Sequence, residues 1–75
     1  MHISISVIIP IYNVSNYIEK CTRTLMEQSF QNVEFIFVND CTPDNSIELL
    51  HNTLKDYPHR HPYIRIINNP KNLGL

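Results

Sequence analysis

Polar and aromatic side chains follow directly after three apolar stretches of this 75-residue sequence. They lie in the segments 10–13 (PIYN), 39–42 (NDCT) and 68–72 (NNPKN). Tyr12 offers a flat ring that can stack on a nucleobase. Asp40 offers a carboxylate that can accept a hydrogen bond from a ring N–H, and Asn13 can both donate and accept. These residue types therefore suit the recognition of a nucleobase.

Each of these side chains also has a purely structural interpretation when the residues are taken alone. Tyr12 could cover the edge of a sheet, because aromatic residues in loops often pack against their surroundings. Asp40 could be an Asx-turn residue that bonds its own backbone, and Asn13 could be a turn former. The residue types leave the binding and the structural interpretations open.

Three apolar stretches rich in β-branched residues predict strands over 5–10, 33–39 and 63–68. The first two are apolar at nearly every position, which is typical of strands covered on both faces. Between the strands the apolar residues recur every three or four positions, which predicts a helix over about 16–28 and a second one beginning near Thr42. The order β-α-β-α-β indicates an α/β, Rossmann-like fold with a three-stranded parallel sheet.

Both predicted helices carry start signals. Asn16 followed by Glu19 fits a capping box. Thr42 fits an N-cap, with Pro43 at the first helical position and Asp44 near the positive end of the helix dipole. The expected buried stripes are Val14, Tyr17, Ile18, Cys21 and Leu25 in the first helix, and Ile47, Leu50, Leu54 and Tyr57 in the second, which Pro58 and Pro62 end.

The strand order also predicts where a ligand binds and which surface is exposed. In an open parallel sheet, ligands bind beyond the carboxyl ends of the strands, where the three polar segments lie. If consecutive strands step in one direction, both helices cover the same face of the sheet. The other face would present Val, Ile and Phe side chains to water, which indicates a fragment or a homo-oligomer formed through that face. The end of the chain within a loop, at Gly74 and Leu75, favours a fragment.

The composition argues against several classes of protein. The formal net charge of −1 leaves no basic stripe for a nucleic acid. Gly74 is the single glycine, which excludes a dinucleotide-binding fingerprint and a Walker loop. Cys21 and Cys41 do not form a disulfide framework, and the sequence has no signal peptide and no long apolar run. A cytoplasmic location is expected, with membrane association of a longer parent protein left open.

Three further residue groups have structural interpretations. His59, Arg60 and His61 lack the acidic or cysteine partners of a metal site and are expected to form a solvated connector. Cys21 is expected in the helix core. Cys41 follows the candidate site, and a reactive thiol is the less favoured interpretation there.

Taken together, residues 4–46 resemble the beginning of the family 2 glycosyltransferases, which have the GT-A fold. The resemblance lies in ISVIIPIYNVSNYIEK, in LMEQSFQNVEFIFVNDCTPDNS and, more weakly, in NNPKNLGL. The family spacing between Pro10, Tyr12, Asn13 and Asp40 is kept, as are a glutamine and an asparagine between them.

The resemblance implies transfer of a sugar from a nucleotide-diphosphate donor, most often a UDP-sugar, to a glycan or lipid-linked acceptor, with a divalent metal (Mg or Mn). It implies that Pro10, Tyr12 and Asn13 line the uridine pocket, and that Asp40 accepts a hydrogen bond from the uracil ring N–H. Residues 1–75 would be the N-terminal, nucleotide-sugar-binding portion of a truncated catalytic domain. The D-x-D motif and the general base of the family are absent from this sequence, so we expect no catalytic residue, no metal ligand and no activity in this chain.

The sequence departs from the family pattern around Asp40. Asn39 replaces the first acid of the V-D-D-G-S turn, and Cys41 and Thr42 replace its glycine and serine. An amide at position 39 keeps hydrogen bonding but loses the charge. The loss of glycine predicts that residue 41 does not need a positive φ.

Two alternatives come from other functional classes. A receiver-type signalling domain needs an acidic pair after its first strand, where this sequence has Ile11, Tyr12 and Asn13, so it is the less favoured. A non-catalytic α/β interaction module would use the exposed face of the sheet to bind a partner.

Overall fold

Three parallel strands form one sheet in the computed structural model, which describes residues 5–29 and 32–69. The strands are β1 (Ile5–Ile11), β2 (Val33–Asn39) and β3 (Ile64–Asn68), in the order β1-β2-β3. The register places Ile11 opposite Asn39, and Asn39 opposite Asn68. The predicted α/β fold with a three-stranded parallel sheet is confirmed, and each strand boundary lies within one residue of its prediction.

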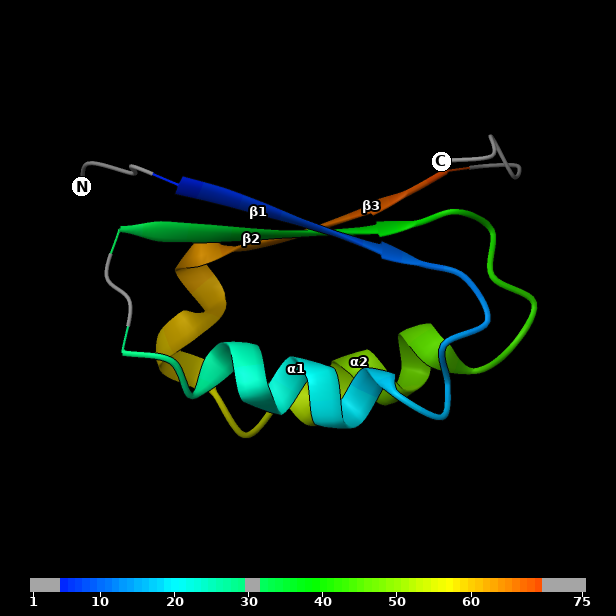
Figure 1. Cartoon of the computed structure of the whole chain (residues 1–75), viewed down its shortest axis with the longest axis horizontal. Coiled ribbons are helices and arrows are strands. Elements are labelled where there is room, and N and C mark those ends of the chain that lie inside the picture. The colour runs from blue at the N-terminus through cyan, green and yellow to red at the C-terminus, as the bar shows by residue number, and fades with distance from the viewer. Residues whose placement is uncertain (1–4, 30–31, 70–75) are drawn as a thin grey trace.

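Two helices, α1 (Ile18–Met26) and α2 (Ser46–Leu54), connect the strands, and a short 3-10 helix, η1 (Pro58–Tyr63), precedes β3. Figure 1 shows that α1 and α2 lie side by side beneath the same face of the sheet. This arrangement follows from right-handed crossovers that step in one direction across the sheet. It confirms that both helices cover one face.

The core lies between β2 and the helices. Val33, Phe35 and Phe37 alternate along β2 and are each no more than 5% exposed. The helix side of the core consists of Ile18, Met26, Leu50, Leu54 and Tyr57. Because successive side chains of a strand point to opposite faces, the phenylalanines of β2 all lie on the covered face.

The opposite face of the sheet has no cover from the described residues. Ile8 of β1 is 65% exposed and Ile67 of β3 is 42% exposed, while Ile36 and Val38 of the central strand are half-buried. The prediction of an exposed apolar face is therefore confirmed for isoleucine and valine but wrong for phenylalanine. The prediction that the strands are covered on both faces is wrong for the described part of the chain, because both crossovers run on the same side.

Helix α1 buries only part of its predicted stripe, since Ile18 lies in the core and Val14 and Leu25 pack partly buried against it. The residues that face the core are Ile18, Thr22 and Met26, whereas Tyr17 is 69% exposed and Cys21 is also exposed. The prediction of Cys21 as a core residue is wrong. Residues four apart share one helix face, and the face that carries Thr22 packs against the sheet. Tyr17 and Cys21 instead line a shallow hollow beside β1.

The predicted capping box at the start of α1 does not form. The helix begins after Tyr17, and no side chain caps it. The backbone carbonyl of Val14 accepts from the N–H groups of Tyr17 and Ile18, at 2.9 and 2.8 Å. The carboxylate of Glu19 turns instead to Arg23, at 3.2 Å.

Helix α2 also begins later than predicted. Its N-cap is Asn45, without a side-chain hydrogen bond, and Thr42 and Pro43 belong to the preceding loop. The predicted burial of Leu50, Leu54 and Tyr57 is confirmed, and Ile47 is half-buried. The helix ends at Leu54, and Pro58 and Pro62 then form part of η1, in which Pro58 occupies a first-turn position.

The connector around η1 caps the carboxyl ends of both helices. Arg60 Nε donates to the carbonyl oxygen of Met26 at 3.1 Å, and its guanidinium also donates to the carbonyl of Gln28. His61 Nε2 lies 2.9 Å from the carbonyl oxygen of Leu54. Cationic and polar side chains commonly satisfy the last carbonyls of a helix in this way. His59 and His61 are exposed, as expected for a solvated connector, but Arg60 and His61 also hydrogen-bond to helix carbonyls, which was not predicted.

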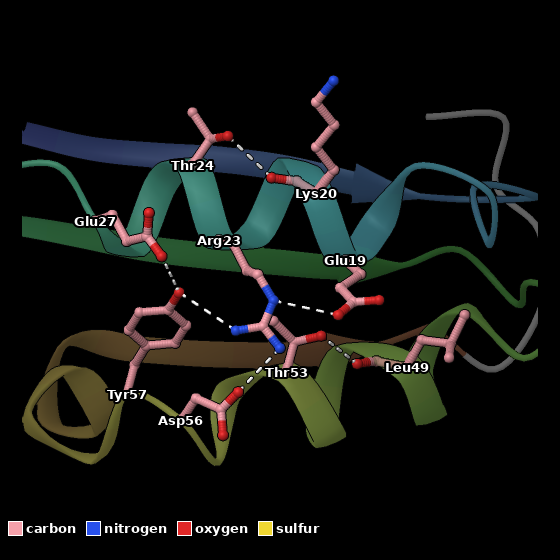
Figure 2. Close-up of polar contacts among 9 residues, drawn as sticks. All are labelled: Glu19, Lys20, Arg23, Thr24, Glu27, Leu49, Thr53, Asp56 and Tyr57. Carbon is pink, nitrogen blue, oxygen red and sulfur yellow. Dashed lines mark hydrogen bonds and ion pairs between the residues drawn. The ribbon is translucent and has the colours of Figure 1, made fainter.

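Arg23 joins α1 to the segment directly after α2, on the surface of the helix layer (Figure 2). Its guanidinium lies 2.9 Å from Asp56 and 3.2 Å from Glu19, and donates to the hydroxyl of Tyr57 at 3.5 Å. The Tyr57 hydroxyl in turn donates to Glu27 at 2.5 Å. The contacts with Tyr57, Asp56 and Glu19 raise the pKa of the guanidinium, and the bond to Glu27 raises the pKa of Tyr57.

Candidate functional site

The carboxyl ends of the three strands meet at one edge of the sheet, because their last residues lie in register. Tyr12 and Asn13 follow β1 there, Asp40 follows β2, and Pro10 is the second-last residue of β1. The backbone N–H of Asp40 donates to the carbonyl of Ile11 at 3.2 Å. The structure thus brings the four predicted site residues to the same edge of the sheet.

Tyr12 and Asp40 differ sharply in their exposure. Tyr12 is 44% exposed, whereas Asp40 is only 3% exposed. A buried carboxylate needs hydrogen-bond donors, and the side-chain amide of Asn69 donates to Asp40 Oδ1 at 3.4 Å. The edge therefore combines an accessible aromatic ring with a shielded acceptor.

Two loop residues at this edge have left-handed backbone conformations. The φ angles are 54° at Asn13 and 59° at Cys41. Asparagine tolerates this region, whereas a left-handed cysteine costs about 1–2 kcal/mol. The prediction that residue 41 does not need a positive φ is wrong. The turn keeps the conformation typical of glycine because hydrogen bonds on either side of Cys41 hold it.

Asp44 is the centre of a polar network between the loops. Its Oδ1 accepts from the hydroxyls of Ser46 and Thr42, at 2.6 and 2.7 Å, and from the backbone N–H of Ser46 at 3.1 Å. Its Oδ2 accepts from the backbone N–H of Ser15 at 3.1 Å. The hydroxyl of Ser46 first, and then that of Thr42, hold the pKa of Asp44 below its ordinary value. The sequence predicts that Asp44 interacts favourably with the helix dipole, but it does not predict this hydrogen-bond network.

The same two hydroxyls accept hydrogen bonds from the loop after β1. The N–H of Asn13 donates to Thr42 Oγ1 at 2.8 Å, and the N–H of Val14 donates to Ser46 Oγ at 3.2 Å. With the bond from Ser15 to Asp44, three successive N–H groups of the first loop are satisfied by the second loop. The spacing T-x-D-x-S is the sequence signal that could have predicted this link, because each of its side chains can bond to backbone.

The structure explains why an amide stands at position 39, which the sequence did not explain. Asn39 Oδ1 accepts from the N–H of Thr42 at 3.0 Å, and Asn39 Nδ2 donates to Asn68 Oδ1 at 3.0 Å. An aspartate could accept the first bond but could not donate the second. An amide at position 39 therefore ties the turn around Cys41 to the end of β3.

The edge brings together an aromatic ring, which can stack on a flat polar ring, and a carboxylate, which can accept a hydrogen bond from one. In residues 5–29 and 32–69, no group of three His, Cys, Asp or Glu side chains comes together to hold a metal ion. None of the helices in those ranges is long and apolar enough to cross a membrane.

Comparisons with known proteins agree on one family. The family model described as "Glycosyl transferase family 2" matches residues 6–75. The uncharacterized glycosyltransferase EpsJ of Bacillus subtilis (strain 168) is 42% identical over 85% of this chain and 17% of its own length. Glycosyltransferase GlyA of Streptococcus pneumoniae serotype 4 (strain ATCC BAA-334 / TIGR4) is 40% identical over 95% of this chain and 10% of its own length. The chain therefore spans less than a fifth of either relative.

A solved structure with the same fold is the mannosyltransferase PcManGT of Pyrobaculum calidifontis, in complex with GDP-Man and Mn2+. The TM-score is 0.86 at 18% sequence identity, and the match covers all of this chain and 22% of that chain.

Proposed function

The chain belongs to glycosyl transferase family 2, and we propose that it forms the nucleoside-binding part of an enzyme that transfers a sugar from a UDP-sugar to a glycan or lipid-linked acceptor. The fold is that of the GT-A glycosyltransferases. The observation that carries the proposal is that Tyr12 and Asp40 lie at the same carboxyl edge of the sheet. Tyr12 is 44% exposed, and Asp40 is 3% exposed.

The two side chains supply complementary interactions. The accessible ring of Tyr12 stacks on the base. The carboxylate of Asp40 accepts from the ring N–H, and its burial excludes competing water, so the bond discriminates strongly against a ring without that donor. We place Pro10 and Asn13 beside them, at the same edge of the sheet. A uracil ring offers one N–H between two carbonyl groups, which matches a single carboxylate acceptor.

Metal chemistry belongs to a different part of the proposed enzyme. PcManGT is described with Mn2+, but the described residues of this chain bring no three ligand-type side chains together and do not fit a metal ion by themselves. We place the ligands of Mg or Mn, and the group that deprotonates the acceptor, outside these residues.

The exposed free thiols of Cys21 and Cys41 support a cytoplasmic, reducing location. No specific observation favours an interaction module or a receiver domain over the family assignment.

Titration calorimetry of the full-length protein with UDP tests the role of Asp40. We expect Asp40→Asn to weaken UDP binding about 10- to 100-fold, because a hydrogen bond to a charged group contributes about 1.5–3 kcal/mol. Glu34→Gln is the matched control, because Glu34 lies near the amino end of β2, where it accepts from Ser6 at 3.1 Å. Equal UDP affinity in the wild type and Asp40→Asn would refute the assignment.

A further inference from the structure

The side chain of Asn69 reaches the buried carboxylate of Asp40. Its Nδ2 donates to Asp40 Oδ1 at 3.4 Å, across 29 positions of sequence. Asn69 is half-buried and Asp40 is 3% exposed, so the contact is largely shielded from water.

The backbone of Asn69 is itself fixed to the end of β2. Its N–H donates to the carbonyl oxygen of Asn39 at 2.9 Å. The side chain of Asn39 then holds the neighbouring Asn68 at 3.0 Å and the N–H of Thr42 at 3.0 Å. Asn39 thereby ties the segment after β3 to the turn that carries Asp40. The position of the Asn69 amide is consequently determined by contacts on the backbone as well as by the carboxylate.

We propose that Asn69 is a positioning residue for Asp40, held in place by Asn39, and that it sharpens recognition of the ring N–H of the nucleobase. A carboxylate rotates about its terminal torsion, which has a broad energy profile. A donor fixed on Oδ1 limits that rotation and sets the plane of the carboxylate before the ligand arrives. Such preorganisation lowers the entropic cost of binding.

This proposal rests on the proposed role of Asp40, and the two are separated by a pair of ligands. UDP carries the ring N–H, and N3-methyl-UDP lacks it. Calorimetry measures both affinities in the full-length wild type and in Asn69→Leu, which keeps the approximate size of the side chain and removes the donor. We expect UDP binding to weaken about three- to tenfold and N3-methyl-UDP binding to change by less than about twofold, so that the ratio of the two affinities shrinks.

Two further variants distinguish the loss of the Asn69 donor from a general loss of folding. Asn69→Asp keeps the shape and replaces the donor with an acceptor beside Asp40, so the affinity ratio should shrink at least as much. Asn52→Leu is the matched control, because Asn52 is an exposed asparagine on α2, and its ratio should equal that of the wild type.

The outcomes assign any failure to one proposal. Equal binding of the two ligands by the wild type would refute the role of Asp40 in reading the ring N–H. A wild type that discriminates, with an unchanged ratio in both Asn69 variants, would overturn the positioning role alone. Equal weakening of both ligands would show that Asn69 acts only on folding, and would also overturn it.

Discussion

The backbone N–H of Ser15 donates to Asp44 Oδ2 at 3.1 Å, although 29 positions of sequence separate the two residues. The bond runs from the loop after β1 to the loop before α2. Because Tyr12 lies in the first loop and Asp40 at the start of the second, the Asp44 carboxylate connects the two loops that carry the proposed base-binding residues.

The first prediction concerns acid sensitivity. Hydroxyl donors lower the pKa of folded Asp44 below its ordinary value of 3.8, so its contribution to stability is fully present above that value. The contribution is lost as the pH falls through the lower pKa of the folded state. We expect the Tm of the wild type to fall more steeply between pH 5 and pH 3, both chosen to bracket the ordinary pKa, than the Tm of Asp44→Asn.

Glu48→Gln is the control for this comparison, because Glu48 is an exposed acid in the first turn of α2. Its melting temperature should follow the wild-type dependence on pH. Parallel curves for the wild type and Asp44→Asn would contradict the stabilising role of the ionised carboxylate.

The strands were the most predictable part of the fold. β-branched runs identify them directly, and β2 (Val33–Asn39) was predicted to the residue. The helix starts were not predictable in the same way, since Thr42 and Asp44 have side chains that suit a helix cap and a cross-loop network equally well. Only the neighbouring loop, with its N–H groups at residues 13–15, decides between them.

The position of the candidate site was predictable from the sequence, but the hydrogen bonds that hold its residues in place were not. Alternation of strands and helices places Tyr12 and Asp40 at one edge, as expected for a parallel sheet. The bonds from Asn69 to Asp40 and from Asn39 to Asn68 depend on side-chain directions in three dimensions. The left-handed φ of Cys41 likewise follows from the surrounding bonds rather than from its residue type.

The second prediction concerns the backbone at Cys41, where φ is 59°. Cys41→Gly relieves the steric cost of the left-handed region, partly offset by the greater freedom of unfolded glycine, so we expect stabilisation by about 0.5–1 kcal/mol. Cys41→Val should destabilise by about 1 kcal/mol, because β-branched residues are outliers there. Urea unfolding measures both free energies.

Cys21 provides the opposite case, because it is an exposed residue within α1. Cys21→Gly should destabilise by about 0.3 kcal/mol, since glycine is less favourable than cysteine inside a helix. Glycine effects of the same sign at both positions would contradict the left-handed conformation at Cys41.

The third prediction concerns a buried hydroxyl. Thr22 is fully buried against the sheet, and its Oγ1 is the one buried side-chain nitrogen or oxygen in the described residues without a hydrogen-bond partner. Thr22→Val keeps the shape and removes the unsatisfied group, so we expect a gain of about 1 kcal/mol in the free energy of unfolding. Thr24→Val is the control, because Thr24 is exposed and its hydroxyl donates to the carbonyl of Lys20 at 2.9 Å (Figure 2). A gain at Thr24 as large as that at Thr22 would point to valine itself, and not to the buried hydroxyl.

The last prediction concerns the carboxyl end of α1. Arg60 satisfies the carbonyls of Met26 and Gln28 from η1, and its positive charge lies at the negative end of the helix dipole. Arg60→Met keeps the length of the side chain but leaves those carbonyls to water, so we expect a loss of about 1–2 kcal/mol in the free energy of unfolding. Arg65→Met makes the same substitution at an exposed position of β3 and should change stability by less than about 0.5 kcal/mol. Equal losses in the two variants would mean that charge or composition, rather than the helix cap, sets the effect.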